Sequence, residues 1–298
     1  MRMSRGKRIV LALLALILLA VFLFFKIQSY READPSRPTA VTTDTPAQQG
    51  AAATDAPGPV QPEDPEDPPE PTVDPDTPYG KALASAAAQG LPTPPEVDIT
   101  SWEFTLVNGD HSIGEYAPEQ LAYLQQTLTD TEVHSEQNGS RCPVDARIAE
   151  ALIAFGQGCK DAGLPVYLSS GYRSYSDQAA NFQRICRNNG ISDGKDSRGH
   201  YITMPAGCSE HQLALCCDIT DRYYEIKNAS IEQTQTYQWL VAHCAEYGFI
   251  HRFPSGKEDV TGVMYEPWHF RYVGPEAAKY MMDNNLVLEE FLALYGVE

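Results

Sequence analysis

Two histidines and one aspartate in the C-terminal half of the chain have side chains that can bind a metal. His211 precedes an apolar run that ends in Asp218, so a carboxylate falls inside an otherwise hydrophobic segment. Such a carboxylate needs a cation or several hydrogen-bond donors to remain ionised. His269, in the segment EPWHFRY, supplies a second imidazole. Because two His and one Asp leave one position of a tetrahedral zinc ion open for water, the three residues predict a catalytic metal site.

Two further polar residues could assist hydrolysis at such a site. Glu266 lies three residues before His269, and a carboxylate that does not bind the metal can take a proton from water. Arg173 follows Gly171 after a short strand-like segment, where its guanidinium could bind a substrate carboxylate or stabilise a developing oxyanion. Either residue alone is typical of a solvated surface. Together with the three metal-binding candidates they favour an active site.

The elements that must position these residues are of mixed type. Hydrophobic periodicity predicts helices and strands without regular βαβ alternation, so we expect an α+β fold with a small antiparallel or mixed sheet flanked by helices. The predicted helices are 144–162, 176–188, 233–247, 275–284 and 287–295. The predicted strands are 165–170, 213–219, 249–253 and 268–273.

The first 31 residues predict a membrane segment. Residues 9–25 form an apolar run of 17 residues between Arg8 and Lys26, close to the lower length limit of a spanning helix. No small-residue cleavage site follows, so an uncleaved single-pass anchor is favoured, with a cleaved signal peptide as the alternative. The four basic residues before the run place the N-terminus in the cytoplasm and the rest of the chain outside the membrane.

The remaining sequence divides into a linker and one folded domain. Residues 32–78 are rich in proline and acidic side chains, with a net charge of −10, and predict a disordered linker. Residues 79–298 carry a net charge of −14 and predict the domain. This negative charge argues against nucleic acid as a partner, because phosphate binding relies on clustered Lys and Arg.

Three segments carry a resemblance to a known family. SSGYRSYSDQ (169–178), PAGCSEHQLALCCDI (205–219) and YGFIHRFPSGKEDVTGVMYEPWHFRYVG (247–274) resemble the VanY-type D-alanyl-D-alanine carboxypeptidases. These are zinc peptidases of family M15 that share a fold with the hedgehog signalling domain. The resemblance covers residues 143–273 and extends weakly to 102–108 and 288–291.

The resemblance implies a site and a reaction. Zinc is expected on His211, Asp218 and His269, with Glu266 as catalytic base and Arg173 at the substrate or transition state. Ser209 and Gln178 fall at substrate-binding positions of the pattern. The implied reaction removes the terminal D-alanine from peptidoglycan stem peptides ending in D-Ala-D-Ala, outside the cytoplasmic membrane. A D,D-dipeptidase or L-alanyl-D-glutamate endopeptidase of the same fold, or an inactive zinc-containing wall-binding module, remain alternatives.

The chain departs from the family pattern at two positions. The pattern reads Ser-x-His-x-x-Gly-x-Ala-x-Asp, whereas this chain has Ala214 for the Gly and Cys216 for the last Ala. Ala214 would be strained if its backbone needed a positive φ. Because strand alternation sends Cys216 and Cys217 to opposite faces, we do not expect Cys216 to compete for zinc. Among the seven cysteines, Cys186 and Cys208 bracket a glycine-rich insertion and are the expected disulfide.

Overall fold

A computed structural model describes residues 73–125, 141–221 and 227–297 of the chain. The predicted anchor at 9–25 and the predicted linker up to residue 72 lie outside these ranges. Within them, every helix is too short or too polar to cross a bilayer. The described residues all fall in one compact unit.

The central element is a four-stranded antiparallel sheet. Its strands are β3 (Tyr167–Ser170), β4 (Cys216–Thr220), β6 (His269–Tyr272) and β5 (Phe249–His251), in this spatial order. A separate antiparallel pair is formed by β1 (Leu121–Gln125) and β2 (Arg141–Asp145). The α+β prediction with a small sheet is thus correct, and the sheet is antiparallel.

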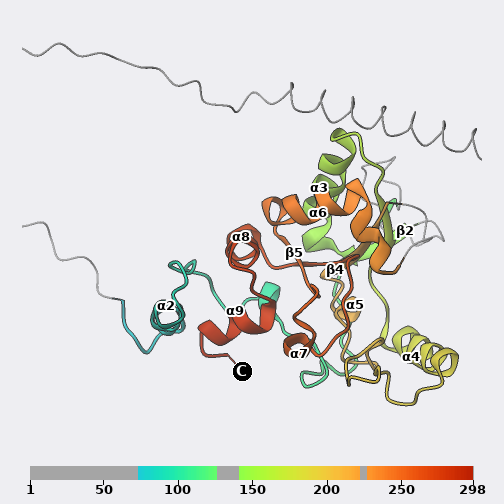
Figure 1. The fold of residues 1–298 in the computed structure, drawn as a ribbon, viewed down its shortest axis with the longest axis horizontal. Coiled ribbons are helices and arrows are strands. Elements are labelled where there is room, and N and C mark those ends of the chain that lie inside the picture. Colours follow the sequence, from blue (N-terminus) through green and yellow to red (C-terminus); the bar gives the residue numbers. More distant parts are fainter. Residues whose placement is uncertain (1–72, 126–140, 222–226, 298) are drawn as a thin grey trace, which may run out of the picture. The chain divides into compact units, whose positions relative to one another are not determined.

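Helices flank the sheet (Figure 1). Near the sheet, α3 packs against α6, and α8 packs against β5. The α-helices are α2 (Pro78–Gln89), α3 (Ala149–Asp161), α4 (Tyr175–Asn189), α5 (Glu210–Leu213), α6 (Gln235–His243), α7 (Glu258–Thr261), α8 (Pro275–Asp283) and α9 (Leu288–Leu294). The 3-10 turns are Trp102–Phe104, Ala146–Ile148, Ala229–Gln233 and Cys244–Tyr247.

The two faces of the central strands have different surroundings. Cys217 and Ile219 of β4 and Phe270 of β6 belong to a buried core that also contains Phe155 of α3. Because side chains alternate along a strand, Cys216 and Asp218 point to the opposite face. His269 lies directly across from Asp218 in the β4–β6 pairing. One face of the sheet therefore supplies the core and the other presents candidate metal ligands.

Two predicted element boundaries were wrong, for local reasons. The helix expected from residue 144 begins at Ala149, because Val144 pairs in β2 and the Asp145 side chain accepts a hydrogen bond from the Arg147 N–H, starting a 3-10 turn. The strand expected from Leu213 begins at Cys216, because Leu213 ends the short helix α5. The other predicted helices and strands are present, with shifts at their ends.

Ala214 makes the turn between α5 and β4. Its φ of 61° and ψ of 18° lie in the left-handed region, which costs a non-glycine residue about 1–3 kcal/mol. The expectation that alanine is strained at this position is confirmed. The turn lets His211 at its start and Asp218 beyond it approach the same point.

The expected Cys186–Cys208 disulfide is not present in the structure. All seven cysteines lie in the described ranges, and all are buried free thiols. The two sulfurs of Cys142 and Cys217 lie 3.8 Å apart in the core. The glycine-rich segment between Cys186 and Cys208 is instead held by backbone contacts, among them a hydrogen bond from the Ile202 N–H to the Gly194 carbonyl.

Because His251, on β5, is buried, we expect the folded chain to be less stable at acidic pH. Its ring contacts the rings of Phe270, Tyr237 and Tyr265, and burial among them lowers the pKa of His251 to about 4. In the unfolded chain the pKa is about 6.5, so between these values the unfolded state binds a proton that the folded state does not. The folded chain should therefore lose about 2 kcal/mol through this residue on going from pH 7 to pH 5.

Urea unfolding of the chelated protein at pH 7 and pH 5 would measure this loss. His251→Gln should remove about 2 kcal/mol of the pH dependence. His243→Gln is the matched control, because it removes an imidazole that is 37% exposed rather than a buried one, and it should remove much less of the pH dependence than His251→Gln. An equal loss of stability in wild type and His251→Gln would contradict the prediction.

Candidate active site

His211 is held by one ring nitrogen, and its other ring nitrogen faces the site. Its Nδ1 lies 2.7 Å from the carbonyl oxygen of Gly171, and because a carbonyl only accepts, Nδ1 carries the proton. Nε2 faces the site and lies 3.5 Å from Asp218 Oδ1. Glycine is required at position 171, since a Cβ there would lie 2.0 Å from the Pro143 carbonyl oxygen.

Asp218 and His269 meet across the β4–β6 pairing. Asp218 Oδ1 lies 3.1 Å from His269 Nδ1, so the ligand atoms of the two histidines converge on this carboxylate oxygen. The other oxygen, Oδ2, accepts a hydrogen bond from Lys227 Nζ at 2.6 Å. Burial would raise the pKa of Asp218, but Lys227 and His211 hold it well below its usual range. Sequence reasoning did not identify Lys227.

Glu210 is a second residue that sequence reasoning missed. Its Oε2 lies 3.1 Å from His269 Nε2, on the side of the imidazole that faces away from Asp218. A carboxylate there accepts a hydrogen bond from Nε2–H, which leaves Nδ1, 3.1 Å from Asp218 Oδ1, as the nitrogen that faces the site. Carboxylates commonly orient metal-binding histidines in this way. Glu210 is the variable position of the Ser-x-His motif, so its only sequence signal was a charged residue next to a ligand.

A buried ion network holds Glu210 in place. Glu210 Oε1 accepts hydrogen bonds from Arg252 Nε at 2.7 Å and Arg271 Nη1 at 2.9 Å. Arg252 also donates two bonds of 2.7 Å to Glu289 of α9, and both arginine side chains are fully buried. Burial would raise the pKa of Glu210, but the two arginines lower it far below its usual range. Glu210 is therefore an anion, as its contact with His269 requires.

The network explains the weak resemblance outside the central motifs. Arg271 Nη2 donates to the carbonyl oxygens of Glu103 and Thr105, each at 2.9 Å. Asn108 Nδ2 donates to Glu289 Oε1 at 3.3 Å. The segments 102–108 and 288–291 thus support the site from two ends of the domain.

Glu266 lies at the edge of the site and is partly open to solvent. Its Oε2 is 3.7 Å from His269 Nδ1, and its side chain is 19% exposed. Burial raises the pKa of Glu266, and the negative charge of Asp218 adds to this against the opposing effect of His269. A carboxylate whose pKa is raised toward neutrality suits general acid–base catalysis.

Arg173 lies beside His211 and is fixed by its neighbours. Its Nη1 donates to Gln178 Oε1 at 2.6 Å and its Nη2 to Ser170 Oγ at 3.2 Å. Gln178 is almost fully buried and donates to the Met204 carbonyl at 2.5 Å. The structure therefore places Gln178 as a support for Arg173, while Ser209 lines the cavity directly before Glu210.

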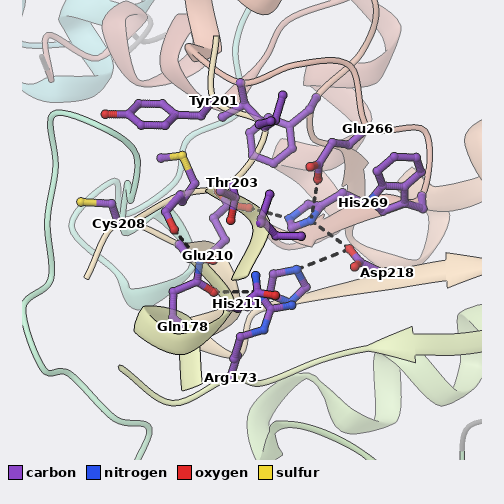
Figure 2. A pocket seen from close by; sticks show the side chains of 18 of the residues that line it. Arg173, Gln178, Tyr201, Thr203, Cys208, Glu210, His211, Asp218, Glu266 and His269 are labelled. Atoms are coloured by element: carbon purple, nitrogen blue, oxygen red, sulfur yellow. Dashed lines mark hydrogen bonds and ion pairs between the residues drawn. The ribbon is translucent and has the colours of Figure 1, made fainter. Parts of the chain in front are cut away.

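All seven predicted site residues line one cavity of about 280 Å³. Figure 2 shows Glu266, His269, Asp218 and His211 pointing toward one another, with Arg173 and Gln178 beside His211. The cavity continues past Tyr201, Thr203 and Cys208. It therefore combines converging metal ligands, a carboxylate and a fixed guanidinium.

The donor set fits a divalent metal. Both imidazoles have the nitrogen away from the site beside an acceptor, so the facing nitrogens are in position to act as metal ligands. Without a metal, burial would lower the pKa of both histidines, but Cys216 and Asp218 raise it, to about 9 for His211 and well above its usual range for His269. Metal binding would therefore release protons from the site. In the described residues, two groups of side chains bring ligand atoms within 4.8 Å of one another. One is Asp218, Glu266 and His269, and the other is His211, Cys216 and His269.

The expectation that Cys216 would not compete for zinc rested on strand alternation, and this reason does not hold. Alternation does separate it from Cys217, but it also places Cys216 on the same face as Asp218, two residues later. Burial would raise the pKa of the Cys216 thiol, yet His211 and His269 lower it to about 7. The family's alanine at this position is thus replaced by a side chain that adjoins the ligands.

Comparison with known proteins identifies a family. Residues 141–275 match the family model of VanY, D-alanyl-D-alanine carboxypeptidase. A D-alanyl-D-alanine carboxypeptidase of Enterococcus faecalis is 32% identical over 225 residues, covering 73% of each chain. YodJ of Bacillus subtilis is 35% identical over 189 residues, which are 62% of this chain and 65%, just under two thirds, of YodJ.

Comparison with solved structures also finds carboxypeptidases. The LdcB LD-carboxypeptidase aligns with a TM-score of 0.54 and 32% identity, covering 65% of this chain and 86% of LdcB. VanYB in complex with D-alanine-D-alanine aligns with a TM-score of 0.50 and 29% identity, covering 65% and 98%. A VanY variant in complex with Zn(II) aligns equally well, with 64% and 99% covered. The chain therefore belongs to the VanY-type D-alanyl-D-alanine carboxypeptidase family.

Proposed function

We propose that the chain is a zinc-dependent carboxypeptidase that removes the terminal D-alanine from peptidoglycan stem peptides. The observation that carries the proposal is the convergence of His211, Asp218 and His269 beside Glu266, in a cavity that also contains Arg173. His211, Asp218, His269 and Arg173 are each held by a separate contact, so most of the arrangement is built before substrate arrives.

Zinc would be held by His211 Nε2, Asp218 Oδ1 and His269 Nδ1. The VanY variant crystallised with Zn(II) supports this choice of metal. When bound, zinc supplies a Lewis acid that polarises the scissile carbonyl and makes water more acidic. Lys227 occupies the second Asp218 oxygen, which leaves one oxygen for the metal.

Glu266 carries the proton in this proposal. Its carboxylate takes a proton from the attacking water and delivers it to the amine of the departing D-alanine. Because Glu266 lies at the cavity edge, its carboxylate can contact both the attacking water and the amine of the departing D-alanine. Its raised pKa lowers the cost of holding the proton between the two transfers.

Arg173 binds the carboxylate end of the substrate. Gln178 and Ser170 fix two of its nitrogens, so its guanidinium is presented without a large loss of rotamer freedom. VanYB binds D-alanine-D-alanine, a ligand with the same carboxyl terminus. A cavity of about 280 Å³ can hold the last residues of a peptide but not a whole stem peptide.

The proposed substrate also indicates where the enzyme acts. Peptidoglycan lies outside the cytoplasmic membrane, and the apolar run 9–25 with its preceding basic residues would place the domain there. We therefore propose a membrane-anchored enzyme that acts at a distance set by the proline-rich linker.

Metal removal tests the proposal. The purified full chain should contain about one zinc per molecule and release D-alanine from a synthetic stem pentapeptide ending in D-Ala-D-Ala. Chelation should abolish release, because the carbonyl loses its Lewis acid, and added zinc should restore it. Release that is unaffected by complete removal of metal would contradict the proposal.

An L,D-carboxypeptidase is the second candidate, favoured by the alignment with LdcB. Such an enzyme would also release D-alanine, but from a tetrapeptide in which D-alanine follows an L-centre. Comparing pentapeptide and tetrapeptide as substrates separates the two activities. Our proposal expects the pentapeptide to be the better substrate, and preference for the tetrapeptide would assign the second activity.

A further inference from the structure

Cys216 lies on the face of the sheet that carries the metal ligands. It is fully buried, it precedes Asp218 by two residues on β4, and it pairs with Arg271 across the sheet. Its diagonal neighbour on β6 is His269, two residues before Arg271. This side chain is absent from the family pattern, which has alanine here.

The sulfur is close enough to share an ion with both histidines. One ligand atom each from His211, Cys216 and His269 lie within 4.8 Å of one another. Two atoms bound to one zinc are at most about 4.4 Å apart, the sum of a zinc–sulfur and a zinc–nitrogen bond. In a tetrahedral site the two atoms are about 3.6 Å apart, so the three ligand atoms would approach one another when the sulfur binds the ion.

The thiol would approach from the side opposite to substrate. His211, Asp218 and His269 line the cavity, whereas Cys216 is fully buried and is not among the residues that line it. A sulfur bound from the sheet side leaves the cavity side of the metal open for water and peptide. Zinc accommodates this, since its catalytic sites expand to five ligands.

We propose that Cys216 is a fourth protein ligand of the catalytic metal, bound as the thiolate after its proton is released to solvent. The inference rests on the proposed function, because it concerns the same metal. A thiolate is a soft ligand that favours zinc over magnesium or manganese. The chain would therefore hold zinc more tightly than a relative with alanine at this position.

Cobalt(II) substitution tests the inference by spectroscopy rather than activity. The metal-free full chain is titrated with Co(II), and a cysteine ligand gives a near-ultraviolet thiolate-to-cobalt charge-transfer band. Cys216→Ala restores the residue of the family pattern and should fold. Cys217→Ala is the matched control, since its thiol lies on the core face.

The outcomes separate this inference from the proposed function. We expect the band in wild type and Cys217→Ala, its loss in Cys216→Ala with cobalt still bound, and zinc loss to a chelator at least about 10-fold faster in Cys216→Ala. One equivalent of cobalt in wild type without the band would overturn the thiolate ligand and leave the proposed function standing. Failure of wild type to bind cobalt or zinc would overturn both.

Discussion

Replacing Glu266 by Gln should lower the rate of D-alanine release by about 10²–10⁴-fold, the usual contribution of a general acid–base residue. Gln has the shape of Glu but cannot take a proton from water. The side chain reaches the cavity, so the substitution removes the proton acceptor where water and substrate meet. Steady-state release of D-alanine from a pentapeptide measures the effect.

The metal content of Glu266→Gln is the necessary control. Glu266 also lies within ligand range of Asp218 and His269, so loss of activity alone would not separate a base from a ligand. We expect Glu266→Gln to bind zinc as tightly as wild type, because none of the proposed metal ligands is changed. Activity within a factor of a few of wild type, or loss of zinc from the variant, would contradict the assigned role.

Removing the carboxylate of Glu210 should produce the second large effect, on stability and on metal affinity together. Glu210→Ala leaves Arg271 and one side of Arg252 without their buried anion, and breaking a buried ion network costs about 3–5 kcal/mol. It also frees the His269 ring to rotate or change tautomer. Loss of such a supporting carboxylate typically weakens metal binding by about 10–100-fold.

A surface carboxylate provides the comparison. Asp283 pairs with Lys279, and both side chains are more than half exposed, so Asp283→Ala should cost less than about 1 kcal/mol. Urea unfolding of the chelated proteins and zinc titration of the folded proteins measure the two effects separately. A Glu210→Ala variant that matches Asp283→Ala in both would show that the network does not position His269.

The ligands could be predicted from sequence because they lie in short motifs. The spacing from His211 to Asp218 spans one turn and one strand, and Glu266 precedes His269 within a single segment. Local patterns of this kind can be recognised in the sequence without knowledge of the fold. Helices α4, α8 and α9 were predicted for the same reason, since periodicity is a local property.

The supports of the site could not be predicted in this way. Glu210 contacts Arg252 and Arg271, which are 42 and 61 residues away in the chain, and Glu289 completes the network from the C-terminal helix α9. Only the folded sheet brings these charges together. In sequence they look like ordinary solvated residues, whereas in the structure both arginine side chains are fully buried.

The error at Cys216 came from applying a correct rule to the wrong pair. Alternation was used to compare Cys216 with Cys217, its immediate neighbour, although Asp218 was the predicted ligand. A residue two positions from a ligand on the same strand shares its face. The pattern thus already indicated that this thiol shares a face with the predicted metal ligands.

The products formed from a stem pentapeptide ending in D-Ala-D-Ala test the central claim most directly. The full chain is incubated with the pentapeptide and the products are identified by mass spectrometry. A tetrapeptide together with free D-alanine, in equal amounts, is the predicted result. A tripeptide with intact D-alanyl-D-alanine, or unchanged pentapeptide in the presence of zinc-loaded protein, would contradict the account.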